Sequence, residues 1–294
     1  MTVDRCIVCE DHNPKLHLQV KDHLVSQEIF DLCKCQNCGF VYVQNPPAPD
    51  QALAYYDTEE YIEHSDNQEG LINKLYHKAR SIMLPYKRKM LEKYDLPKKI
   101  LDIGTGTGYF LNYMKSQEYD VTGIEISGTA RDFGKKNFDL DIFHPDDMFK
   151  EGFPRGFSYI SFWHVLEHIY EPRRVLTKLH DILAQDGVVA IALPNHSSLD
   201  AEAYGDYWCA YDVPRHLWHF DFSSFKQFAE SCGFRLDKIK MLPLDPFYNS
   251  LISASYKKNI SARIMIPLVS GASLVRGGLD KKKASSIIYF LRRA

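Results

Sequence analysis

Short apolar runs alternate with amphipathic stretches through the middle of this 294-residue chain. The run 98–103 starts polar and becomes apolar, as a central parallel strand does, and further strands are predicted at 119–126, 140–144, 157–163 and 188–193. After Glu171 and Pro172, apolar residues recur at helical spacing, which predicts a helix that ends at Gly187. This alternation of strand and helix predicts a doubly wound α/β fold with a mostly parallel sheet.

The last third of the chain is harder to interpret. A helix is predicted over 223–232, a strand over 234–242 and a final, antiparallel strand over 284–291. The segment 260–278 is apolar and basic, but it is too short and too interrupted to span a bilayer. It is either a pair of buried helices or a weak membrane-surface contact.

A glycine-rich turn follows the first of these strands. Gly104, Gly106 and Gly108 alternate along LDIGTGTGYFLNYM, where a backbone without Cβ atoms can turn sharply and approach a ligand. A dinucleotide fingerprint would place its third glycine at position 109, which is Tyr109 here. Glu125 follows the turn by about 20 residues, the offset at which a carboxylate reaches ribose hydroxyls; a solvated acid at a strand end is the alternative.

The turn, with Asp102 before it, resembles motif I of the class I S-adenosylmethionine-dependent methyltransferases. The segment HVLEH at 164–168, followed by a proline and a helix, is similar to the region after strand four of a broad methyltransferase family, although Phe157-Ser158 replaces the usual Phe-Asp. The resemblance covers about residues 95–240. It implies a seven-stranded, Rossmann-like class I methyltransferase sheet and S-adenosylmethionine as cofactor.

By this resemblance Glu125 holds the ribose, and Asp146 or Asp147 lies near the adenine unless the two form a surface acidic turn. The full cofactor-binding set that it implies is Asp102, Gly104, Thr105, Gly106, Gly108, Tyr109, Glu125, Ile126, Asp146, Asp147, Trp163 and His164.

The N-terminus carries an independent metal signal. Cys6 and Cys9 form one CxxC pair and Cys35 and Cys38 another, which is the pattern of a closed tetrahedral zinc site. The spacing favours Cys35 over Cys33. A disulfide framework is the alternative, but MTVDRCIVCE has no secretory pattern, so we expect reduced thiols, a cytoplasmic location and structural zinc.

The predicted organisation therefore has three parts: a zinc ribbon at 1–48, a helical cap over the cofactor at 49–97, and a methyltransferase domain at 98–294 with an insertion near 245–280. Tyr55, Tyr56 and Tyr61 lie in the cap, where they either cover the cofactor or pack.

Methyl transfer requires alignment of a nucleophile with an already activated methyl group, and a general base is optional. The candidate catalytic residues are His164, after strand four, and His216 and His219 in DYWCAYDVPRHLWHF, after strand five. Glu167 and His168 are equally well explained as structural residues. The aromatic segment predicts an acceptor-binding loop in which Arg215 binds a phosphate or carboxylate.

The net charge narrows the range of acceptor classes. The formal charge is −2, with 36 basic and 38 acidic residues, which argues against nonspecific nucleic-acid binding. Sugar C-methyltransferases have a similar ribbon and core, but also a C-terminal domain that we do not expect here, so their catalytic residues are not transferred. We expect a small-molecule or glycan-precursor acceptor, such as a nucleotide sugar. The alternatives are an RNA methyltransferase with a zinc module and a noncatalytic S-adenosylmethionine-binding scaffold; the oligomeric state is not predicted.

Overall fold

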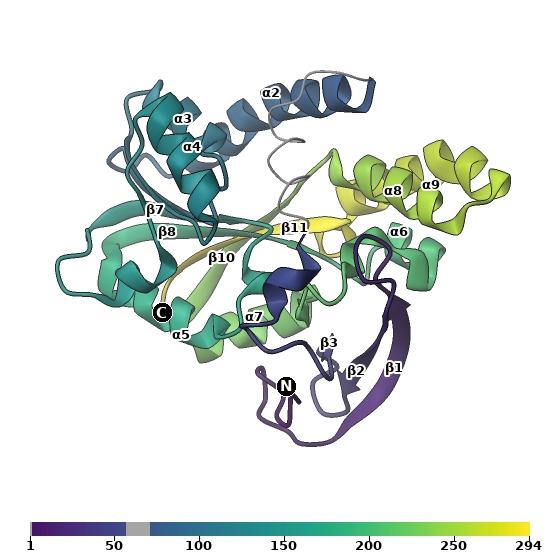
Figure 1. Cartoon of the computed structure of the whole chain (residues 1–294). Coiled ribbons are helices and arrows are strands. Elements are labelled where there is room, and N and C mark those ends of the chain that lie inside the picture. Colours follow the sequence, from purple (N-terminus) through teal and green to yellow (C-terminus); the bar gives the residue numbers. More distant parts are fainter. Residues whose placement is uncertain (1, 57–70) are drawn as a thin grey trace.

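The computed structural model describes residues 2–56 and 71–294, with side chains from residue 78 onward in the second range. Its largest element is a seven-stranded sheet in the order β10-β11-β8-β7-β4-β5-β6 (Figure 1). The strands are β4 (Lys99–Ile103), β5 (Asp120–Ile124), β6 (Ile142–Phe143), β7 (Phe157–Trp163), β8 (Leu183–Pro194), β10 (Phe234–Met241) and β11 (Ser286–Arg293). Strands β4 to β8 pair in parallel, and β11 runs antiparallel to both of its neighbours. The predicted seven-stranded, mostly parallel sheet is confirmed.

Helices cover both faces of this sheet because successive strand residues point to opposite sides. Ile100 packs with the helices on one face, and the next residue, Leu101, packs on the other. The first face carries α2 (Leu71–Glu92), α3 (Tyr109–Lys115) and α4 (Gly128–Phe138), and the second carries α5 (Pro172–Ile182) and α7 (Phe222–Ser231). The central strands are therefore buried on both sides, as their continuous apolar runs predict.

The prediction that Gly187 ends the helix after β7 is wrong. Helix α5 ends at Ile182, and β8 begins at Leu183, which pairs with Phe157. Gly187 lies inside β8, next to a register irregularity in its pairing with β7. A Cβ at this glycine would lie 2.7 Å from the Leu183 side chain, so the glycine lets the strand fold over that leucine.

A second, antiparallel sheet forms around the N-terminus. Its strands are β1 (Pro14–Lys21), β2 (Ile29–Cys35), β3 (Val41–Val43) and β9 (Trp218–His219), in the order β1-β2-β3-β9. Strand β9 comes from a much later part of the chain: Tyr42 pairs with Trp218, and Val41 pairs with His219. The ribbon is therefore completed by the larger part of the protein.

The remaining elements are short helices and one helical pair. The short ones are η1 (Ala52–Tyr55), η2 (Pro145–Phe149), η3 (Leu166–His168), α6 (Leu199–Tyr204), η4 (Gly205–Tyr207), η5 (Cys209–Tyr211) and η6 (Lys281–Lys283). Between β10 and β11 lie α8 (Asp245–Lys257) and α9 (Ile260–Leu279), which pack together at one end of the molecule (Figure 1). Among the described helices, none has the length and apolar character needed to cross a bilayer. Tyr61 of the predicted cap lies outside the described residues.

Candidate active site and metal centre

The glycine turn joins β4 to α3 and packs closely against the segment after β7. Gly104 has φ +71°, and a Cβ on it would lie 2.4 Å from a methyl carbon of Val165. Glu125, directly after β5, accepts the N–H of Gly106 at 2.8 Å and that of Ser127 at 2.9 Å, one on each carboxylate oxygen. A carboxylate has further lone pairs, so Glu125 can still accept hydrogen bonds from ligand hydroxyls.

Asp102 is the penultimate residue of β4, just before this turn, and is 2% exposed. It accepts a 2.5 Å hydrogen bond from the Ser161 hydroxyl. Burial raises the pKa of Asp102 to about 6, although that hydrogen bond and the charge of Lys87 oppose the rise. Burial also lowers the pKa of Lys87 to about 8, against the attraction of Asp102 and Asp245. Lys87 lies in α2 with its Nζ 4.2 Å from the Trp163 ring centroid. Sequence reasoning missed Lys87, because a lysine in a basic helix carries no motif.

Two buried polar atoms around the turn have no hydrogen-bond partner among the described residues: Thr105 Oγ1 and Trp163 Nε1. Ile126, beside Glu125, is 67% exposed and offers an apolar face at the carboxyl edge of the sheet. An acceptor carboxylate, backbone close to the turn, unpartnered polar atoms and an exposed apolar side chain are what an adenosine-containing cofactor requires. The residues therefore fit S-adenosylmethionine.

Three other members of the predicted cofactor set make contacts with neighbouring residues. Asp147 accepts a 3.0 Å hydrogen bond from the His144 N–H and so caps η2. Its other oxygen forms an ion pair with Lys150 at 2.6 Å. The Asp146 side chain is exposed. Tyr109 stacks under the guanidinium of Arg80, 3.7 Å from its ring centroid.

His164 leaves β7 in a left-handed conformation, with φ 59°. Its Nε2 is 3.1 Å from Asp245 Oδ2, and its Nδ1 is 3.6 Å from Glu167 Oε1. Burial works against protonation, but the two carboxylates prevail and raise the pKa of His164 to about 9. Asp245 comes from the first turn of α8, so it reaches this site only through the tertiary fold.

Two of the predicted catalytic histidines, His164 and His216, lie near Glu167. Among the described residues, no contact is found between the third, His219, and this carboxylate. His216 Nε2 is 4.0 Å from Glu167 Oε1, close to His164 on the same carboxylate. His219 lies in β9, is 4% exposed, and has a pKa far below its usual value because of burial.

The aromatic segment 206–220, which contains β9, packs largely inside the protein, where we expected an acceptor-binding loop. Trp208 is buried and donates to Asp200, and Trp218 is buried and donates to the carbonyl of Ile169. The Arg215 guanidinium is 2.9 Å from Asp22 Oδ1 and 2.7 Å from Asp212 Oδ1. The guanidinium charge is therefore neutralised by carboxylates inside the protein and does not bind an anionic acceptor.

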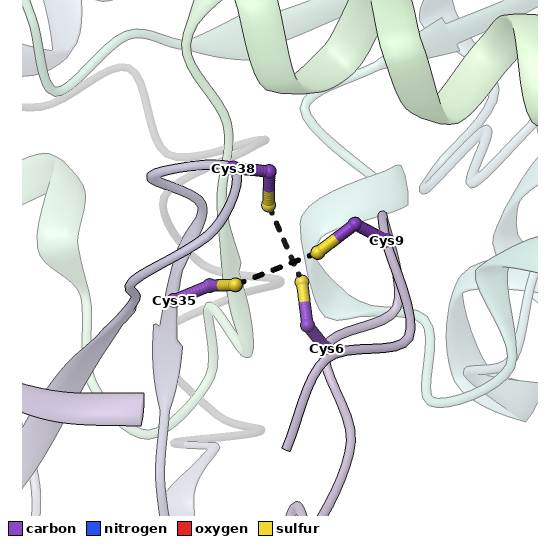
Figure 2. Close-up of side chains that lie close together, drawn as sticks. All are labelled: Cys6, Cys9, Cys35 and Cys38. Carbon is purple, nitrogen blue, oxygen red and sulfur yellow. Dashed lines mark hydrogen bonds between the residues drawn. The ribbon is translucent and has the colours of Figure 1, made fainter. Parts of the chain in front are cut away.

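The four CxxC cysteines converge from two segments of the ribbon: the N-terminal loop and the end of β2 with the turn after it (Figure 2). The sulfurs of Cys6 and Cys38 are 3.6 Å apart, and those of Cys9 and Cys35 are 3.5 Å apart. A tetrahedral zinc site with Zn–S bonds of about 2.3 Å needs sulfurs about 3.8 Å apart. The arrangement therefore fits one tetrahedral metal ion. Cys33 lies two residues before Cys35 in β2 and is not part of the cluster.

Comparison with known proteins identifies a methyltransferase domain in this chain, in agreement with the fold. The family described as "Methyltransferase domain" matches residues 75–239, more than half of the chain. A 23S rRNA (uracil(747)-C(5))-methyltransferase of Pyrococcus horikoshii is 28% identical over 67 residues, which are 23% of this chain and only 16% of that protein.

Two solved structures share the fold at low sequence identity. The plantazolicin methyltransferase BamL has a TM-score of 0.54 at 16% identity, covering 83% of this chain and 94% of that one. The 1,6-didemethyltoxoflavin-N1-methyltransferase of Burkholderia thailandensis has a TM-score of 0.52 at 11% identity, covering 94% and 100%.

Proposed function

Since this chain belongs to the methyltransferase-domain family and is an S-adenosylmethionine-dependent methyltransferase, we propose that its acceptor is a small molecule or glycan precursor, such as a nucleotide sugar. The observation that carries the proposal is the charge around the acceptor side. Carboxylates of Asp245 and Glu167 flank His164, and the whole chain has a formal charge of −2. This charge balance gives no attraction for a polyanionic RNA backbone and is compatible with a small acceptor.

In this proposal the cofactor lies over the glycine turn. Glu125 holds the ribose hydroxyls, Ile126 packs on the adenine, and Asp102 with Lys87 surrounds the methionine end. When bound, S-adenosylmethionine supplies a methyl group already activated by its sulfonium. The chain then has to orient the acceptor in line with the C–S bond and exclude water.

Among the predicted catalytic residues, we favour His164 as the one that meets the acceptor. Its side chain is 35% exposed, whereas that of His216 is 10% exposed. His164 also follows β7 directly and adjoins Val165, which touches the glycine turn. Catalytic roles for His216 and His219 remain predictions. Both side chains are buried, which favours a role in supporting the site over direct contact with the acceptor.

The experiment is a methyl-transfer screen with isotopically labelled cofactor. Nucleotide sugars and glycan precursors form one arm, and a pool of unmodified RNA forms the other. Label in a small-molecule product supports the proposal, and label only in RNA overturns it. His164→Gln should reduce transfer at least tenfold with cofactor affinity within about twofold, because the general acid–base and positioning roles of a side chain are worth 10²–10⁴-fold. His17→Gln, at an exposed position of β1, serves as the control.

RNA is the second candidate acceptor. It is favoured by the partial match to the Pyrococcus rRNA methyltransferase, which is named for methylation of a uracil in RNA. The match covers only 16% of that protein. The RNA arm of the same screen decides between the two.

We also propose that the cysteine cluster holds a structural zinc ion. Four thiolates close a tetrahedral site and leave no position for a substrate, so the metal stabilises the ribbon and does no chemistry. Protein purified without added metal should contain zinc at this site, and Cys35→Ser should lose it. Cys33→Ser is the matched control from the same strand. Equal metal loss from both variants would contradict the assignment.

Helix α9 supports a further proposal, a weak contact with an anionic membrane surface. Ile260, Ile264, Leu268, Val275 and Leu279 form a stripe along the helix and are 61–86% exposed. Lys257, Lys258 and Arg263 lie around its N-terminal end. An exposed apolar stripe beside basic residues suits an interface with anionic lipid.

Sedimentation with vesicles tests this contact. The chain should cosediment with phosphatidylglycerol-containing vesicles and not with vesicles of phosphatidylcholine alone, and Ile264→Glu with Leu268→Glu should abolish it. Absence of cosedimentation, or self-association through the same stripe, would contradict the proposal.

A further inference from the structure

Glu167 is a buried carboxylate without a hydrogen-bond donor. It lies in η3, just after β7, and is 1% exposed. Neither of its oxygens has a hydrogen-bond partner among the described residues. Burial of a charged group is costly, so such groups are normally paired or bound to a metal ion. His164, whose Nδ1 is 3.6 Å from Glu167 Oε1, is a cation beside this carboxylate but donates no hydrogen bond to it.

Two imidazoles lie near this carboxylate, and a backbone carbonyl oxygen sets the tautomer of each. His168 Nδ1 is 3.1 Å from the carbonyl oxygen of Arg215, and His216 Nδ1 is 2.8 Å from that of Ala210. A carbonyl oxygen can only accept, so in each ring Nδ1 carries the proton and Nε2 keeps its lone pair. The Tyr56 hydroxyl, 3.2 Å from the same His168 nitrogen, is a further partner. Histidines that bind metals are oriented in this way, through a backbone carbonyl on the other nitrogen.

We propose that Glu167, His168 and His216 bind one divalent transition-metal ion on the acceptor side of the active site. One ligand atom from each of the three lies within 4.8 Å of the others. Ligand atoms around a zinc ion are about 3.3 Å apart, so small side-chain rotations close the site. Two imidazoles and one carboxylate suit Zn²⁺, Fe²⁺ or Mn²⁺ and leave coordination positions open.

The location gives the ion a role distinct from that of the cysteine cluster. Glu167 is two residues after Val165, which touches the glycine turn, while His216 is two residues before β9. His164 Nδ1 lies 3.6 Å from Glu167, and Asp212 Oδ2 lies 3.9 Å from His216 Nε2. An ion here would sit beside the residue that we propose meets the acceptor, where its open positions can take an acceptor oxygen.

Manganese binding tests the site separately from the thiolates, because Mn²⁺ prefers oxygen and imidazole ligands to sulfur. Zinc-containing protein is dialysed against chelator and titrated with Mn²⁺, and free aquo-Mn²⁺ is followed by electron paramagnetic resonance. We expect one bound Mn²⁺ per chain, with at least tenfold weaker binding in Glu167→Gln and His216→Gln. His196→Gln, a histidine outside the cluster, is the matched control, and Cys6→Ser should leave Mn²⁺ binding unchanged.

Circular dichroism establishes whether each variant folds. A second measurement needs no variant: wild-type crystals soaked in Mn²⁺ should give an anomalous-scattering peak between the three side chains. Lack of Mn²⁺ and Zn²⁺ binding by the wild type outside the thiolates, or binding equally strong in Glu167→Gln, overturns the proposal; His164 as the cation that neutralises Glu167 would then be sufficient. Neither readout depends on methyl transfer, so this proposal and that of the acceptor can fail separately.

Discussion

At the scale of single residues, backbone conformation and burial set the properties of the cofactor site. Gly104 combines a left-handed φ of +71° with direct contact on Val165. Gly152 has a similar φ of +82° but has no atom within 4 Å of an added Cβ. The two glycines therefore separate the cost of the backbone conformation from the cost of the contact.

Gly104→Ala is expected to weaken S-adenosylmethionine binding at least tenfold, because the added methyl must displace Val165 or the turn. Gly152→Ala pays only the left-handed backbone cost, about 1–2 kcal/mol of stability, and keeps its cofactor affinity. Calorimetric titration measures the cofactor affinity of both variants. Adding Val165→Ala to Gly104→Ala should restore part of the affinity; an unchanged affinity in Gly104→Ala would show that the turn does not carry the cofactor.

Asp102 gives a prediction about pH. The folded state raises its pKa from 3.8 to about 6, so the folded protein binds this proton more tightly than the unfolded chain does. Its contribution therefore favours folding at low pH, and is lost as pH rises from about 4 to 6. Asp102→Asn removes that loss. The stability of the variant relative to wild type should rise across this window by up to about 3 kcal/mol.

Urea denaturation of cofactor-free protein at several pH values measures this difference. Asp146→Asn, at an exposed carboxylate, should show no comparable trend. A pH-independent difference for Asp102→Asn would mean that Asp102 is not destabilised by burial.

At the scale of elements, the ribbon and the segment before β9 are joined by a buried ion pair as well as by strand pairing. Arg215 donates to Asp22 and Asp212 and to the carbonyl oxygen of Tyr55 at 2.8 Å. Burial would raise the pKa of Asp22, but the pairing with Arg215 and the backbone N–H groups of its own turn lower it to about 2. Asp22 is thus ionised throughout the physiological range and needs this partner.

Arg215→Met should destabilise the protein by about 3–5 kcal/mol, because it leaves a buried carboxylate unpaired. Arg174→Met is the matched control: it removes an arginine whose partner is Glu171, with side chains 56% and 65% exposed, and should cost less than about 1 kcal/mol. Urea denaturation measures both. Adding Asp22→Leu to Arg215→Met should cost much less than the two single changes combined, and full additivity would contradict the pairing.

At the scale of the whole molecule, β9 makes the ribbon part of one cooperative structure. Removal of the proposed zinc by a thiol-directed reagent should lower the melting temperature of the entire protein in a single calorimetric transition, because the ribbon shares a sheet and the Arg215 pair with the larger part. Two separate transitions, with the methyltransferase part unchanged, would show that the ribbon folds independently. The same reagent applied to Cys6→Ser is the control and should cause little further shift.

Local patterns of the sequence were sufficient for much of this protein. The apolar runs predicted the strands, the alternating glycines with Glu125 predicted the cofactor turn, and the paired CxxC spacing identified the four cysteines that converge. These features are local because a strand, a turn or a chelating loop is specified by residues a few positions apart.

Only the tertiary structure decided which side chains become buried and which distant groups meet. DYWCAYDVPRHLWHF has the composition of a binding loop, but it packs because β9 joins the ribbon and Asp22 pairs with Arg215. Lys87 beside Trp163, Asp245 beside His164, and His216 beside Glu167 come from segments far apart in the chain. No sequence spacing encodes such contacts, because they depend on how helices and loops pack around the sheet.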